Sequence, residues 1–158
     1  MDERPARHFS MMEIASVIAR RSTCGRRQVG CVLVDAHGRV LSMGHNGAPR
    51  GEPHCVDRPC PGRDAATGQG LELCEATHAE ANALLFCPDV MKIHTCYATT
   101  APCLHCVKLL MNTSCETIIY LDDYTQRPQA QELWCRLNSW KLQNGQPQRR
   151  FAQLEIAL

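Results

Sequence analysis

The sequence predicts a single α/β domain in which helices pack on a sheet with parallel crossovers. Val29–Val34 (VGCVLV) is an almost continuous apolar run, as expected of a strand buried on both faces. The turn sequence Asp35-Ala36-His37-Gly38 links it to a second strand over Val40–Gly44. Further along, helical and strand-like segments alternate, which is typical of α/β sandwiches. A length of 158 residues fits one domain, so we expect residues 1–158 to fold as one unit.

The remaining elements follow from local signals. Ser10-Met11-Met12-Glu13 has the form of a capping box and predicts a helix from Ser10 to about Arg20–Arg21. The stretch from Asn46 to Leu73 is rich in Gly, Pro and Cys and lacks periodicity, so something must hold it in place. The second half predicts helices over Ala79–Phe86, Cys103–Met111 and about Gln129–Leu137, and strands over Thr95–Thr99, Thr117–Leu121 and Phe151–Leu158.

Composition excludes several classes of protein. Seventeen Lys and Arg against sixteen Asp and Glu give a net charge of +1, which argues against binding to long nucleic acid or anionic membranes. An apolar content of 44% excludes a disordered chain. No apolar run reaches the roughly 18 residues of a membrane span, and the N-terminus is too polar for a signal peptide. We therefore expect a soluble, cytoplasmic domain.

Eleven cysteines are an unusual number for such a chain. Without a secretion signal, clustered cysteines are more often metal ligands than disulfide partners. The positions of interest are Cys24, Cys55, Cys60, Cys74, Cys103 and Cys106. The other five lie in apolar or periodic segments and are interpreted as small buried hydrophobic residues: Cys31, Cys87, Cys96, Cys115 and Cys135.

Two short segments predict a catalytic zinc site. His78-Ala79-Glu80 and Pro102-Cys103-Leu104-His105-Cys106 match the H-x-E…P-C-x-x-C pattern of zinc deaminases. Cys103 and Cys106 share one helix face, and a helix N-terminus favours the thiolate that binds metal. With His78 they make three ligands, which leaves the fourth tetrahedral position for water. The alternatives are a plain zinc knuckle and a redox-active Cys pair. The preceding proline and the upstream His-x-Glu argue against both.

Glu80 is the predicted proton carrier. Zinc lowers the pKa of bound water from about 15.7 towards 7, so hydroxide is available at neutral pH to attack C4 of a cytosine. Glu80 would take the proton of the water, deliver it to a ring nitrogen and protonate the leaving ammonia. Because Glu80 lies two residues after His78, we expect the first helical turn to point end-on into the pocket.

At these motifs the chain resembles the cytidine/deoxycytidylate deaminase superfamily, and within it the deoxycytidylate deaminases. The resemblance runs from about Ser22 to Tyr124 and includes TCGRRQVG, GHNGAPRG, HCVD, ELCEATHAEANAL, TTAPCLHC and IIYLDDY. It implies a three-layer α/β/α sandwich with a mixed five-stranded sheet and a homo-oligomer. It also implies hydrolysis of dCMP to dUMP and ammonia, which supports thymidylate synthesis.

The resemblance also implies substrate contacts. Asn46 matches a residue that contacts sugar and base, Ala79 one whose backbone reads the pyrimidine edge, and Tyr124 an aromatic residue of the pocket. Arg26 falls where bacterial relatives place a residue near the 5′-phosphate. From the residues alone, Asn46 could instead be a turn residue, and Arg26 a solvated arginine. Arg27 and Arg50 are rival candidates for the phosphate, because a guanidinium can bind two oxygens at once.

A second, structural zinc is predicted beside the irregular segment. Four thiolates from Cys24, Cys55, Cys60 and Cys74 would form a closed tetrahedral site and order the loop. Deoxycytidylate deaminases of this type carry such a metal in this neighbourhood. His54 could replace one of the four ligands. The alternatives are four free thiols and a Cys55–Cys60 disulfide.

Three other functions were weighed against dCMP deamination. The pocket could act on another cytosine nucleoside or nucleotide, including a 5-substituted dCMP. A nucleic-acid editing deaminase is disfavoured by the near-neutral charge, by 5% aromatic residues, and by Ala101 where tRNA deaminases tend to carry Glu. A zinc-stabilised binding module without catalysis would have no reason to keep Glu80.

Overall fold

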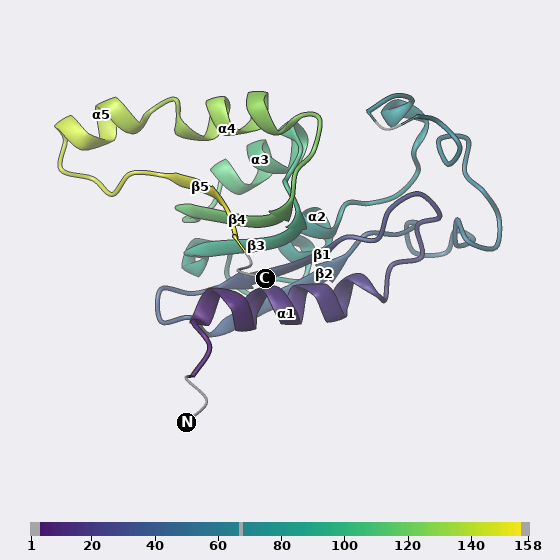
Figure 1. Cartoon of the computed structure of the whole chain (residues 1–158), viewed down its shortest axis with the longest axis horizontal. Coiled ribbons are helices and arrows are strands. Elements are labelled where there is room, and N and C mark those ends of the chain that lie inside the picture. The colour runs from purple at the N-terminus through teal and green to yellow at the C-terminus, as the bar shows by residue number, and fades with distance from the viewer. Residues whose placement is uncertain (1–3, 67, 156–158) are drawn as a thin grey trace.

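Five strands form one mixed sheet in the computed structural model, which describes residues 4–66 and 68–155 (Figure 1). The strand order is β2-β1-β3-β4-β5. β1 runs antiparallel to both β2 and β3, whereas β3, β4 and β5 are mutually parallel. The bounds are β1 Gly30–Val34, β2 Val40–His45, β3 Thr95–Thr100, β4 Thr117–Asp122 and β5 Arg150–Gln153.

Helices cover both faces of this sheet. The helices are α1 Arg7–Ala19, α2 Ala79–Leu85, α3 Leu104–Met111, α4 Arg127–Cys135 and α5 Asn138–Gln143, with short 3₁₀ turns at Leu71–Leu73 and Val90–Lys92. Val32 and Val34 pack with Met12 of α1, while Cys31 and Leu33 face the core formed with α2, α3 and α4. The residues of β1 thus alternate between two buried faces. This arrangement confirms the predicted three-layer sandwich.

The first helix begins earlier than the sequence predicted. α1 starts at Arg7, and its N-cap is Ala6, with φ −58° and ψ 144°. Ser10 therefore lies inside the helix, and the capping-box prediction is wrong. Pro5 lies just outside the helix, next to the N-cap, where the lack of a backbone N–H costs no helical hydrogen bond.

The C-terminal part also differs in detail. The helix predicted over Gln129–Leu137 begins two residues earlier, at Arg127, with Pro128 in its first turn. The short helix α5 was not predicted. The predicted strand Phe151–Leu158 is confirmed only over Phe151–Gln153, and residues 156–158 lie outside the described residues. Cys87 and Cys135 are only half-buried, so the prediction of burial is wrong for these two.

The irregular segment after β2 extends away from the sheet as a separate lobe (Figure 1). Its base is closed by an isolated bridge in which the backbone N–H of Gly47 donates to Thr77 (3.2 Å) and the N–H of Thr77 donates to Gly47 (2.8 Å). The loop therefore leaves and re-enters the domain at one point, beside the start of α2. Within the described residues, no helix combines the length and apolar character required to cross a membrane.

Strand β2 and helix α2 approach each other closely at Gly44. A Cβ atom on Gly44 would lie 2.3 Å from the carbonyl oxygen of Ala79 and 2.5 Å from the backbone nitrogen of Ala83. The hydroxyl of Ser42 donates to the Ala83 carbonyl at 2.7 Å. Because Gly44 has no side chain, α2 can lie this close to the sheet.

Replacing Gly44 tests this close approach. We predict that Gly44→Ala lowers the free energy of unfolding by about 1–3 kcal/mol, because the backbone of α2 must shift. Urea denaturation followed by circular dichroism measures the change. Gly25→Ala is the control, since its Cβ would meet mainly the flexible Arg63 side chain, at 3.0 Å. Equal losses in the two variants would contradict the account.

Candidate active site

The functional residues gather at one edge of the sheet. The register pairs Gly30 with His45 and Thr100 with Asp122, so the start of β1 meets the ends of β2, β3 and β4. The backbone N–H of Gly30 donates to the Thr99 hydroxyl at 3.1 Å and ties β1 to β3 there. Helices α2 and α3 both begin at this edge.

The N-caps of these two helices carry candidate metal ligands. His78 caps α2 and Cys103 caps α3, both with extended backbone angles. The His78 Nδ1 atom lies 3.4 Å from the Sγ atoms of both Cys103 and Cys106. Among the described residues, these three form the group whose donor atoms all lie within 4.8 Å of one another. One imidazole nitrogen and two thiols are a donor set that fits zinc and leaves a fourth position open.

Hydrogen bonds join the three side chains and shift their pKa values. A hydrogen bond from Cys106, and a second from His78, lower the pKa of Cys103 to about 4. The pKa of His78 is raised by its hydrogen bond to Cys103. The hydrogen bond to Cys103, followed by burial, raises the pKa of Cys106. The lowered pKa of Cys103 favours its thiolate, which is the form that binds metal.

Glu80 reaches the same site from the first turn of α2. Its side chain is only 3% exposed, and its Oε2 accepts a hydrogen bond from Cys106 Sγ at 3.5 Å. Burial raises the pKa of this carboxyl. His78 and Glu80 face one cavity although they are two residues apart, because α2 points its N-terminus into it.

The cavity has a volume of about 210 Å³ and contains most of the residues singled out from the sequence. Sequence reasoning gave no role in the cavity to six lining residues, whose side chains offer no ionisable group: Val29, Gly68, Leu71, Ala76, Thr100 and Ala101. The full lining is Cys24, Arg26, Arg27, Val29, Asn46, Gly68, Leu71, Cys74, Ala76, His78, Ala79, Glu80, Thr100, Ala101, Cys103 and Tyr124.

Asn46 is buried in the cavity wall and fixed by three hydrogen bonds. Its Oδ1 accepts from the Ser22 hydroxyl (2.6 Å) and from the backbone N–H of Val29 (2.8 Å). Its Nδ2 donates to the Arg27 carbonyl at 2.7 Å. An amide has two N–H donors, so one remains for a ligand. Asn46 therefore organises the sheet edge and still presents a donor at the cavity.

The candidate phosphate residues have different surroundings. The half-buried guanidinium of Arg26 donates to the carbonyls of Gly62 (3.2 Å), Ala66 (2.5 Å) and Gln69 (2.9 Å) and so fastens the irregular loop. Arg27 is exposed, and its guanidinium lies 5.8 Å from the centre of the Tyr124 ring. Arg50 is exposed and does not line the cavity.

The four loop cysteines are neighbours but are less tightly gathered than the His-Cys-Cys group. The Sγ atoms of Cys55 and Cys60 lie 3.7 Å apart as free thiols. Cys60 also interacts with Cys24 and Cys74. A hydrogen bond from the backbone of Glu75 lowers the pKa of Cys60, which favours the metal-binding thiolate. His54, the substitute ligand considered from the sequence, is exposed.

Residues 5–122 match the model of the family described as the cytidine and deoxycytidylate deaminase zinc-binding region. The chain belongs to this family. It is 39% identical over 125 residues to the deoxycytidylate deaminase of Schizosaccharomyces pombe, an alignment that covers 77% of this chain but 38% of the yeast protein. It is also 39% identical over 123 residues to the deoxycytidylate deaminase of Mycobacterium phage D29, covering 74% of this chain and 95% of the phage protein.

A solved structure supports the same fold. The dCMP deaminase of cyanophage S-TIM5, crystallised in complex with dCMP and dUMP, superposes with a TM-score of 0.72. The superposition covers 96% of this chain and 99% of the phage chain at 22% identity. The mixed five-stranded sheet with flanking helices is thus the family's fold.

Removing one proposed zinc ligand tests the metal centre. We predict that Cys106→Ser lowers the zinc content by about one ion per chain, because a serine hydroxyl is not among the groups that bind zinc in such sites. Elemental analysis after dialysis measures this. Cys135→Ser, which changes a half-buried cysteine on α4, serves as the control and keeps its zinc. Unchanged zinc in Cys106→Ser would overturn the ligand assignment.

Proposed function

We propose that this protein is a zinc-dependent dCMP deaminase that hydrolyses dCMP to dUMP and ammonia. The observation that carries the proposal is the buried carboxyl of Glu80 beside an open His-Cys-Cys ligand set in one cavity. The deoxycytidylate deaminases among its relatives support the choice of substrate. The product dUMP would be a precursor for thymidylate synthesis.

Zinc held by His78, Cys103 and Cys106 would supply an activated water molecule for hydrolysis. Glu80 would accept the proton of that water and transfer it to N3 of the cytosine ring. It would then take the proton of the new hydroxyl group at C4 and deliver it to the amino group, so that the C4–N bond breaks and ammonia leaves. Burial raises the pKa of this carboxyl, which favours its protonated form and suits a group that must accept a proton and pass it on. The enclosed position of Glu80 keeps bulk water from exchanging that proton.

The other cavity residues position the nucleotide. The free N–H of Asn46 donates to the substrate, and the buried backbone of Ala79 reads the edge of the pyrimidine. Tyr124 forms the wall next to the sugar. Arg26, the candidate for the phosphate from the sequence, lines the same cavity, and three of its N–H groups donate to carbonyls of the loop.

A homo-oligomer and a cytoplasmic location stay predictions from the sequence. Exposed apolar side chains at and after the end of α2 support association of copies, since they would otherwise remain in water. These are Leu85 (73% exposed), Phe86 (77%) and Met91 (63%).

We also propose the second, structural zinc at Cys24, Cys55, Cys60 and Cys74. The contacts of Cys60 with Cys55 and Cys74 support it, as does the hydrogen bond that favours the Cys60 thiolate. A metal there would tie the irregular loop, which contains Cys55 and Cys60, to Cys24 before β1 and to Cys74 before α2.

The central test of the proposed function is Glu80→Gln. We predict at least about a 100-fold loss of kcat for dCMP, with zinc content and fold unchanged, because the amide cannot carry a proton. Ammonia release and elemental analysis measure the two quantities. Near-normal turnover in this variant would refute the mechanism.

The substrate class is tested on the unaltered protein. Zinc-loaded enzyme is offered dCMP, CMP, deoxycytidine, cytosine and dCTP in parallel, with ammonia release as the measure. The proposal predicts turnover of dCMP well above the others. Release from deoxycytidine alone would favour a nucleoside deaminase, and no release from any compound would contradict nucleotide deamination.

Removing a ligand of the proposed structural zinc should affect stability more than turnover. Cys60→Ser should lose about one zinc per chain and lower Tm by at least about 4 °C, while turnover of the folded fraction changes little. Differential scanning calorimetry, elemental analysis and the ammonia assay measure these effects. Cys135→Ser is again the control. Unchanged zinc content in Cys60→Ser would refute the second site.

A further inference from the structure

An open hollow lies directly beside the cavity that holds Glu80. It is lined by Arg27, Asp123, Tyr124, Thr125, Arg127 and Pro128. Arg27 and Tyr124 line both spaces. A ligand that fills the cavity and extends past Tyr124 therefore enters this hollow, whose charged side chains decide which groups it accepts.

Of the two adjacent arginines, Arg27 is the one whose guanidinium has no hydrogen-bond partner among the described residues. The guanidinium of Arg26 donates three hydrogen bonds to backbone carbonyls of the loop. The guanidinium of Arg27 stacks over Tyr124 at 5.8 Å, and neither an ion pair nor a side-chain hydrogen bond joins it to another described residue. Its charge and donors are thus free at the junction of the two spaces.

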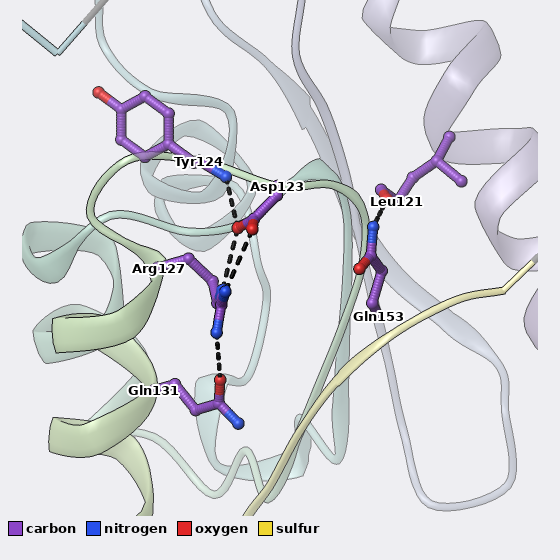
Figure 2. A network of polar contacts seen from close by, with 6 residues as sticks. All are labelled: Leu121, Asp123, Tyr124, Arg127, Gln131 and Gln153. Carbon is purple, nitrogen blue, oxygen red and sulfur yellow. Dashed lines mark hydrogen bonds and ion pairs between the residues drawn. The ribbon is translucent and has the colours of Figure 1, made fainter.

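The second cation of the hollow is already neutralised. The Nε and Nη2 atoms of Arg127 donate to the two oxygens of Asp123 at 3.0 and 3.2 Å (Figure 2). Nη1 of Arg127 donates to Gln131 at 3.2 Å, and the backbone N–H of Tyr124 donates to Asp123 at 2.7 Å. The hydrogen bonds from Arg127 lower the pKa of Asp123, so its carboxylate stays charged at neutral pH.

We propose that Arg27 binds the 5′-phosphate of the substrate and that Asp123 restricts the site to one phosphate. A phosphate at the junction meets the free Arg27 guanidinium, which can bind two of its oxygens. A second phosphate would extend into the hollow, where it meets the Asp123 carboxylate and an arginine that is already paired. The inference deepens the proposed deaminase function and rests on it.

The first experiment compares dCMP with deoxycytidine in wild type, Arg27→Gln, Arg27→Lys and Arg26→Gln. We expect Arg27→Gln to lower kcat/KM for dCMP at least about 10-fold while kcat/KM for deoxycytidine stays constant, since charged hydrogen bonds to the phosphate are lost. Arg27→Lys should retain part of the preference for dCMP over deoxycytidine. Arg26→Gln should affect both substrates equally, because it loosens the loop. An unchanged preference in Arg27→Gln, or its selective loss in Arg26→Gln, would overturn the proposal.

The second experiment compares dCTP with dCMP in Asp123→Asn. The substitution keeps the shape of the side chain, removes the negative charge and releases Arg127. We expect kcat/KM for dCTP relative to dCMP to rise at least about 10-fold, because a charge-assisted contact to the added phosphates replaces a repulsion. The double variant Asp123→Asn/Arg127→Gln should return towards the wild-type ratio. An unchanged ratio in Asp123→Asn would refute the role of Asp123.

Equilibrium binding separates failure of this inference from failure of the deaminase assignment. If wild type deaminates neither dCMP nor deoxycytidine, the proposed function fails. Calorimetric titration with dUMP and with deoxyuridine still tests Arg27, because the phosphate contact does not depend on the reaction. Weaker dUMP binding in Arg27→Gln with unchanged deoxyuridine binding supports the assignment. Equal changes for both ligands, in a variant that melts like wild type, refute it.

Discussion

The hydrogen-bonded contact among His78, Cys103 and Cys106 is the interaction on which the rest of this structure depends. It joins the N-terminal ends of α2 and α3, which are 25 residues apart along the chain. Hydrogen bonds from Cys106 and His78 lower the pKa of Cys103, which favours the thiolate form that binds metal. The sheet brings the two helix ends together, with α2 held against β2 at Gly44 and α3 held directly after β3.

Residues of the irregular lobe also line the cavity that contains this cluster. Cys24 and Cys74 contribute to the wall of the cavity and also lie near Cys60. Arg26 fastens the lobe through three carbonyls, and the bridge between Gly47 and Thr77 closes its base. The order of this segment therefore determines the shape of the cavity, so a metal among its cysteines would act on substrate binding through geometry.

The hairpin, the parallel strands and the ligand triad could be predicted because their signals are local, such as the β-branched run of β1 and the fixed spacing of Pro102 and the two cysteines. The true start of α1 could not be predicted, since the helix begins at Arg7 without a side-chain cap and the Ser10 motif lies inside it. The different roles of Arg26 and Arg27 were also beyond sequence reasoning. They depend on where the carbonyls of a distant, non-periodic loop lie, and no residue pattern encodes those positions.

Anomalous diffraction at the zinc edge, from crystals grown with zinc and dUMP, tests the central claim most directly. The account predicts a peak about 2.0–2.3 Å from His78 Nδ1 and from the Sγ atoms of Cys103 and Cys106, with no fourth protein ligand and with the Glu80 carboxyl facing the pyrimidine ring. A peak whose fourth position is filled by a protein side chain would contradict it, as would the absence of zinc between these residues. Either result would mean that the site is not a hydrolytic centre.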